Sequence, residues 1–370
     1  MDMEMMEAEE LFERAEEARA RSRFQEALEG YRKALEGFPR ERLLERLHCL
    51  QKIGDCLRMM GEFEEAKRSF TSALELAEEG GDELEMADTL VGLGLSRRAL
   101  GELEGAKGDL ERALEIYQGW DDAEGEGFCL WAMGGLWRMF GELKRAEEAF
   151  QEALFIFEGL EDKGAQGYCH CGLGGVYRVM GRYSTSLEHY LRANELLKEM
   201  GDIFGTAYSY CGIGNAHRMF GDLERALEHF SEATRLYREI GDRVSYAYTL
   251  WGEGTALKVM RKDEGARRLF LEAKALFEAT GDRRGLIYVL LSLGELQYLN
   301  GKPEGLSQAL GEVKEILKLH PFRLERCHWL LYRWLAEGGK EEGWEEIKKE
   351  YRAKGSLFPQ ERPSFPLNLP

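Results

Sequence analysis

The chain has 370 residues, of which 50 are Lys or Arg and 68 are Asp or Glu, so its formal net charge is −18. Such an acidic chain repels a nucleic-acid backbone unless a local basic stripe opposes the overall field, and we expect no nucleic-acid partner. No stretch approaches the roughly 18 apolar residues that a membrane span needs, and the acidic N-terminus does not resemble a signal peptide.

Along the chain, small residues recur with a period of 40 residues. Two glycine series and one alanine series keep this step. The first glycine series is Gly54, Gly94, Gly134, Gly174, Gly214, Gly254 and Gly294. The second is Gly61, Gly101, Gly141, Gly181, Gly221 and Gly301, interrupted at Arg261, and the alanine series runs from Ala73 to Ala273. A fixed period of this length predicts one supersecondary unit stacked many times, which is a solenoid.

Each unit divides into two amphipathic helices. In residues 207–246, apolar side chains recur at three- and four-residue steps in both halves. Gly221 falls between the halves, where a left-handed residue is needed to end the first helix. Gly-Asp pairs at 81–82, 201–202, 241–242 and 281–282 place an aspartate to cap the helix that follows. Gly214 lies inside a first helix, where glycine costs about 1 kcal/mol relative to alanine, so we expect close approach of a neighbouring helix there.

The repeat resembles the tetratricopeptide repeat (TPR). In one unit the residues that carry the resemblance are Gly54, Gly61, Ala66, Phe70 and Ala73. Each unit is about six residues longer than the common TPR, which makes it similar to the long variant of spindle-orientation adaptors, rapsyn and bacterial regulators. The resemblance implies an all-α, right-handed superhelical solenoid of about eight helix-turn-helix repeats. We expect it to span residues 1–322, with units near 8–41, 47–86, 87–126, 127–166, 167–206, 207–246, 247–286 and 287–318. A degenerate capping helical pair at 323–354 and a Pro-rich tail at 355–370 follow.

In TPR proteins the first helix of each unit lines a concave groove, so the resemblance also implies a set of binding residues. A cationic column consists of Arg58, Arg98, Arg138, Arg178, Arg218 and Lys258. The remaining candidates are mostly aromatic or thiol side chains, namely Phe128, Tyr168, Tyr208, Tyr248, Tyr288, Trp131, Trp251, Cys171, Cys211 and Asn215. Guanidinium groups fork onto carboxylates, and aromatic side chains anchor a ligand with little loss of rotamer entropy. In the alternative reading, each arginine bridges to a carboxylate of the next unit and the column is structural.

No motif predicts catalysis, a metal site or a cofactor. Cys169-His170-Cys171 has metal-binding residue types, but side chains two apart on a helix point to different sides. Glu253 interrupts an otherwise apolar column, and we expect it to pair with Lys258 or with an arginine of an adjacent unit. It is either a decayed repeat position or a polar site inside the solenoid. The seven cysteines, an odd number, suit reduced thiols, and we expect a cytoplasmic protein.

These features predict a non-catalytic scaffold, adaptor or regulator that binds a protein or peptide with acidic and apolar residues. One alternative is a carrier of an anionic hydrophobic small molecule or cofactor. Another is a peptide-sensing regulator similar to Rap-type proteins. Those proteins carry a separate N-terminal helical bundle, whereas the first repeat here begins near residue 8, which argues against that class. The apolar tail is expected to dock on its own solenoid or in a neighbouring molecule's groove, and in the second case the protein would self-associate.

Overall fold

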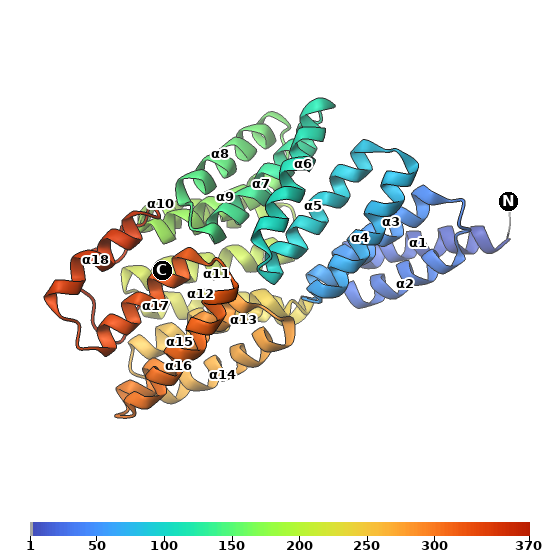
Figure 1. Ribbon diagram of the computed structural model, residues 1–370. Helices are drawn as coiled ribbons and strands as arrows, with labels where there is room; N and C mark the ends of the chain where they lie inside the picture. The colour runs from blue at the N-terminus through green and yellow to red at the C-terminus, as the bar shows by residue number, and fades with distance from the viewer. Residues whose placement is uncertain (1–2) are drawn as a thin grey trace. The chain divides into compact units, whose positions relative to one another are not determined.

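The computed structural model describes residues 3–370, and these residues form helices joined by short turns, without a strand (Figure 1). The predicted all-α class is therefore confirmed. The chain divides into two compact units, which are described separately. Unit 1 consists of Met1–Ala132 with Ile240–Asp242, and unit 2 of Met133–Glu239 with Arg243–Pro370.

Unit 1 contains three helical pairs and the start of a seventh helix. Its helices are α1 (Met3–Ala20), α2 (Phe24–Gly37), α3 (Leu43–Met59), α4 (Phe63–Gly80), α5 (Glu83–Leu100), α6 (Leu103–Gly119) and the beginning of α7 (Ala123–Phe140). Consecutive helices pack on each other, and α3 also contacts α5 directly. The buried side chains between them include Tyr31, Leu57 and Phe70. This is the alternating stack that a two-helix repeat produces.

Unit 2 continues the repeat and ends with a helical pair and a tail. Its helices are the end of α7, α8 (Leu143–Gly159), α9 (Lys163–Met180), α10 (Tyr183–Glu199), α11 (Ile203–Phe220), α12 (Leu223–Ile240), α13 (Arg243–Val259), α14 (Asp263–Thr280), α15 (Arg283–Leu299), α16 (Pro303–Leu319), α17 (Arg323–Ala336) and α18 (Glu341–Arg352). The first helices α9, α11, α13, α15 and α17 contact one another in sequence order. They therefore form one continuous inner layer in unit 2.

The glycines inside first helices make room for an aromatic side chain. A Cβ at Gly174 would lie 2.8 Å from the ring of Tyr190, and a Cβ at Gly212 would lie 2.1 Å from the same ring. Tyr190 is thus held between the first helix of its own repeat and the first helix of the next. Phe230 is placed in the same way between Gly214 and Gly252. This confirms the close helix approach that the glycine period predicts.

Turn and cap positions also follow the sequence pattern. Gly221 ends α11 with φ 80°, and Arg261 takes the same left-handed conformation with φ 58° at the point where the glycine series is interrupted. Asp202 and Asp282 cap the next helices, each accepting a backbone N–H three residues on at 2.8 Å. Local chemistry alone therefore fixes the boundaries of these helices.

The C-terminal segment of unit 2 returns to much earlier repeats. Arg323, at the start of α17, forms an ion pair with Glu142 at 3.3 Å. The backbone N–H of Leu357, beyond α18, donates to the carbonyl of Met180 at 3.0 Å. Figure 1 shows this segment in orange to red, with the chain end close to the middle of unit 2. The tail therefore lies on its own solenoid, as one of the two sequence expectations stated.

Candidate functional site

Four cations of the predicted column lie in unit 2, each in the last turn of a first helix. They are Arg138 in α7, Arg178 in α9, Arg218 in α11 and Lys258 in α13, and we call them the arginine row. Because α9, α11 and α13 contact one another in order, the 40-residue step places these side chains on neighbouring helices. Packed helices lie about 8–10 Å apart, so successive guanidinium groups are close enough to affect one another.

Arg138 and Arg178 have no partner among the residues that the structure describes. The Nε atoms of both are buried without a hydrogen bond, and so is Nη1 of Arg178. Gly175 leaves space for one of these groups, since a Cβ there would lie 2.4 Å from Nη1 of Arg138. A buried N–H donor that lacks an acceptor costs about 1–3 kcal/mol, and more when the group is charged. Both half-buried arginines therefore keep buried N–H groups that no acceptor in residues 3–370 satisfies.

Arg218 is fully buried but bonds only to neutral groups. Its Nη2 donates to Oδ1 of Asn215 at 2.9 Å, and its Nη1 donates to Oδ1 of Asn368 in the tail. The side-chain amide of Asn368 donates in return to the backbone carbonyl of Arg218 at 2.8 Å. The guanidinium lies 5.3 Å from the ring centroid of Trp251. Burial, together with the nearby charge of Arg178, lowers the pKa of Arg218 to about 9.

Lys258 differs from these arginines because it is paired. Its ammonium bonds to Glu295 of α15, and both side chains are buried. This is the structural alternative for the column, and within unit 2 it holds at this rung. The expected pairing of Glu253 with Lys258 is wrong, because Lys258 bonds to Glu295 instead. Glu253 is half-buried without a hydrogen bond or close ion pair among the described residues, although the charge of Arg238 in the preceding repeat acts on it. Burial raises the pKa of Glu253.

Glu295 is the site residue that the sequence analysis missed. Besides Lys258, it accepts the hydroxyl of Tyr332 in α17 at 2.6 Å and the backbone N–H of Leu367 in the tail at 2.6 Å. One buried carboxylate thus joins the solenoid, the cap and the tail. The signal was present, since Glu295 follows the candidate Asn215 by two full repeats and occupies the same column.

The tail covers the inner helices by two sets of contacts. Near its start, the hydroxyl of Ser356 donates to the carbonyl of Val179 at 2.6 Å. Toward its end, the ring of Phe365 lies 5.2 Å from that of Tyr298 and 5.7 Å from that of Tyr332. The side chains of Phe358, Leu367 and Leu369 are buried.

Several aromatic and thiol candidates are less accessible than the sequence suggested. Trp251 and Tyr288 are buried, and the hydroxyl of Tyr288 donates to Glu325 of α17 at 2.9 Å. Cys171 and Cys211 are also buried, and burial raises the pKa of both thiols. These four side chains are therefore packed between helices in this structure, and their role in ligand binding stays a prediction.

Three tyrosines of the predicted set remain half-buried in unit 2, namely Tyr168, Tyr208 and Tyr248. The hydroxyl of Tyr168 donates to the carboxylate of Asp202 at 2.6 Å. The ring of Tyr208 stacks on Phe204, with the centroids 6.4 Å apart, and that of Tyr248 packs edge-on against Phe277.

Four predicted residues fall in unit 1. Arg58 bonds to Asp55 at 3.4 Å, and Arg98 donates to the backbone carbonyl of Ala132 at 3.1 Å. Phe128 stacks on Trp131 with ring centroids 5.6 Å apart. Both arginines have protein partners, but these bonds reach a carboxylate of the same repeat and a backbone carbonyl, not the carboxylate of the next repeat that the structural alternative requires.

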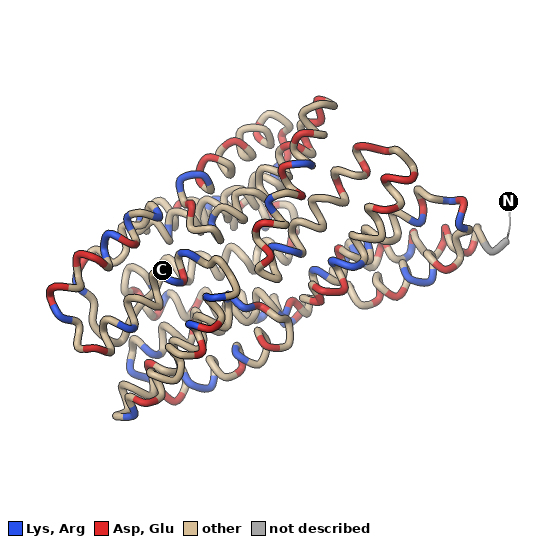
Figure 2. The backbone as a smooth tube through the Cα atoms, viewed as in Figure 1, with Lys and Arg blue, Asp and Glu red and all other residues tan. Residues whose placement is uncertain are grey.

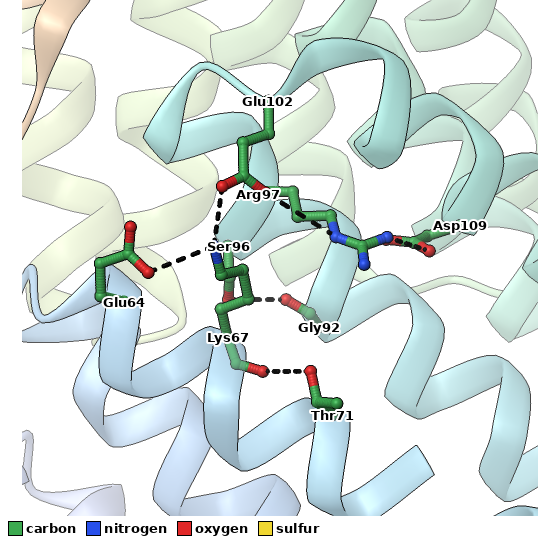
Figure 3. Close-up of polar contacts among 8 residues, drawn as sticks. All are labelled: Glu64, Lys67, Thr71, Gly92, Ser96, Arg97, Glu102 and Asp109. Atoms are coloured by element: carbon green, nitrogen blue, oxygen red, sulfur yellow. Dashed lines mark hydrogen bonds and ion pairs between the residues drawn. The ribbon is translucent and has the colours of Figure 1, made fainter. Parts of the chain in front are cut away.

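Unit 1 also carries a surface hollow bordered by Lys67, Thr71, Arg97 and Glu102. Figure 3 shows that two of its cations are paired with carboxylates: Lys67 bonds to Glu102 at 2.7 Å, and Arg97 bonds to Asp109 at 2.6 Å. Figure 2 shows Lys and Arg interspersed with Asp and Glu along the helices of both units. Missing protein partners therefore distinguish Arg138 and Arg178 from Lys67 and Arg97 at this hollow.

Among residues 3–370, no group of three or more His, Cys, Asp or Glu side chains is placed to hold a metal ion. Within the same part of the chain, no helix has both the length and the apolar character needed to cross a membrane.

Comparison with known proteins identifies the repeat. Residues 18–79, 85–158 and 168–239 match the family described as tetratricopeptide repeat. No curated protein sequence matches the chain.

Similar folds occur among solved structures of Rap proteins. A Rap protein complexed with competence and sporulation factor is 14% identical with a TM-score of 0.69, and the match covers 95% of this chain and 99% of that one. The Rap conjugation regulator of plasmid pLS20, in complex with the Phr* peptide, is 14% identical with a TM-score of 0.61 and coverage of 94% of both chains. RapI in its apo form is 16% identical with a TM-score of 0.55, covering 74% of this chain and 97% of that one. Since nearly the whole Rap chain has a counterpart here, the argument against that class from a missing N-terminal part is wrong.

Proposed function

Because the chain belongs to the tetratricopeptide repeat family, we propose that it is a scaffold or regulator whose arginine row binds an acidic, apolar-anchored peptide segment. The observation that carries this proposal is the unpaired state of Arg138 and Arg178. A protein that needs these arginines only for packing gains nothing from keeping their N–H groups buried and unbonded. A carboxylate on a bound segment supplies the missing acceptors through charge-assisted hydrogen bonds.

A peptide suits this surface for two further reasons. The tail shows that an extended segment fits against the inner helices, with apolar side chains buried and backbone groups bonded. In addition, the pLS20 regulator is described in complex with a peptide, and its fold is similar. Aromatic and apolar anchors supply contact area, and the arginines supply charge selectivity.

The test compares two double variants that remove the same charge. Arg138→Gln with Arg178→Gln alters the row, whereas Arg192→Gln with Arg235→Gln alters exposed arginines that bond only to glutamates on their own helices. The probe is an array of 12-residue peptides in which Asp or Glu alternates with Leu and Phe, together with copies in which Asn and Gln replace the acids. We expect at least tenfold weaker binding of the acidic peptides by the row variant alone, a difference of about 1.4 kcal/mol.

The row variant is also expected to keep the melting temperature of the wild type, since these arginines lose no protein partner. Equal binding by both double variants, or equal binding of acidic and amide peptides, would remove the basis of the proposal.

A further inference from the structure

We propose that residues 356–370 are an intramolecular ligand of the arginine row, and that the partner segment displaces them by presenting a carboxylate where the tail presents Asn368. The inference rests on the proposed function and adds to it the register, the side-chain pattern and the regulation of the bound segment. It is carried by the contacts of the last six residues of the tail.

These contacts define a binding register for residues 365–369, which we call the frame. Leu367 and Leu369 are buried, and Asn368 between them bonds twice to Arg218. Successive side chains of an extended segment point to opposite sides, so apolar, polar and apolar side chains meet different surfaces of the protein. The backbone N–H of Leu367 donates to Glu295 at 2.6 Å, which fixes the register by one residue. Two residues earlier, Phe365 lies between two tyrosine rings. The frame is aromatic, any residue, apolar, polar, apolar.

The polar position of this frame is filled by a group that suits it poorly. Arg218 is a buried guanidinium, and the amide oxygen of Asn368 carries no charge to compensate it. Burial lowers the pKa of Arg218, and the positive charge of the neighbouring Arg178 lowers it further. A carboxylate in place of this amide oxygen adds a charge–charge attraction to the hydrogen bond, and burial leaves that attraction weakly screened. Aspartate in this register is therefore the better ligand.

The weaker side chain of the tail is offset by its attachment. A tethered segment competes at an effective concentration on the order of millimolar, without diffusing to its site. The tail therefore keeps the row covered against peptides of low affinity. Peptides that place a carboxylate at the position of Asn368 displace the tail. Asn368 therefore sets the minimum affinity that a competing peptide needs, and the site remains available to peptides above that affinity.

The experiment uses the full chain and two synthetic probes. Both probes are acetylated and amidated peptides with the sequence of residues 361–370, one unchanged and one carrying Asn368→Asp. The protein variants are Asn368→Ala, which removes both bonds to Arg218, and Asn368→Asp, which gives the tail the charge of the better ligand. Glu361→Gln serves as the matched control, because Glu361 is exposed and makes no hydrogen bond or ion pair within residues 3–370.

We expect the aspartate probe to bind the wild-type chain about tenfold more tightly than the asparagine probe. Asn368→Ala should tighten the binding of both probes by about tenfold, Asn368→Asp should weaken both by a similar factor, and Glu361→Gln should change neither. Hydrogen exchange at the Leu367 amide should be faster in Asn368→Ala and slower in Asn368→Asp, which reports the state of the tail independently of the probes.

Equal affinity of a probe for the wild type and both Asn368 variants would overturn the competition. Equal affinity of the two probes would overturn the preference for a carboxylate. Absence of binding to the Asn368→Ala variant would show that a free peptide does not bind in the frame. The two proposals fail differently. If the aspartate probe binds all tail variants alike but is lost with Arg138→Gln and Arg178→Gln, the row is the ligand site and the tail does not regulate it. If Asn368→Ala raises the affinity for the aspartate probe but the row variant does not change it, the tail competes at a site to which Arg138 and Arg178 do not contribute.

Discussion

Replacing Lys258 by methionine should destabilise unit 2 strongly. Methionine keeps the length and the apolar stem of lysine, so the substitution removes the charge with little change in packing. It leaves the carboxylate of Glu295 buried, with two neutral donors and no cation. Breaking a buried ion pair by removing one partner costs about 3–5 kcal/mol, because an uncompensated charge remains.

The expected loss is measurable in two ways. In urea, unfolding followed by far-ultraviolet circular dichroism and by tryptophan fluorescence should give a free energy of unfolding lower by about 3–5 kcal/mol. In a thermal scan, a cooperative unit of 150–250 residues loses about 2–4 °C per kcal/mol, so the melting temperature should fall by about 6–20 °C. The control is Lys274→Met, which breaks a partly exposed ion pair with Glu278 four residues along the same helix. That pair should contribute about 0.3–0.5 kcal/mol.

A Lys258→Met variant that unfolds within about 1 kcal/mol of the wild type, or with the same loss as Lys274→Met, would refute this reasoning. It would mean that Tyr332 and Leu367 are sufficient to hold Glu295 without the ammonium group. It would also contradict our distinction between the paired rung of the row and its unpaired arginines.

Two further predictions concern single positions in unit 2. Gly212→Ala places a methyl group 2.1 Å from the Tyr190 ring, so overpacking of about 1–3 kcal/mol should outweigh the helix-propensity gain of about 1 kcal/mol. Gly159→Ala, which meets nothing within 4 Å, should leave the free energy of unfolding unchanged or raise it, and equal effects of the two variants would contradict the packing argument. Glu253→Gln should stabilise the protein by about 0.5 kcal/mol at pH 7 and not at pH 4. The pKa of Glu253 is raised above 4.5 in the folded protein, so the native state binds its proton more tightly than the unfolded chain and loses stability as the pH rises through this window. An equal gain at both pH values in urea titrations would show that the ionisation of Glu253 is not involved.

Much of the architecture was accessible from the sequence because its causes are local and repeated. A helix boundary depends on a left-handed residue such as Gly221 and a capping aspartate such as Asp202, and both act within four residues. The glycine at 174 predicted a close approach, although the sequence did not identify Tyr190 as the ring that fills the space. The column that contains Arg138, Arg178 and Arg218 was visible for the same reason, since a constant period places equivalent residues on equivalent faces.

The state of each residue in that column was decided by contacts that no period encodes. Arg218 meets Asn368, which is 150 residues away, and Glu295 meets both Tyr332 and Leu367 from a cap and a tail outside the repeat. Glu253 was expected to pair with Lys258 or with an arginine because it interrupts an apolar column, but Lys258 bonds to the buried carboxylate of Glu295 instead. Charge pairing depends on distance in space and on burial, and both are set only when the C-terminal segment of unit 2 packs on its inner helices. The sequence by itself determined the repeat, its helices and the row of cations, whereas the tertiary structure alone decided that Lys258 is neutralised and that Arg138 and Arg178 are not.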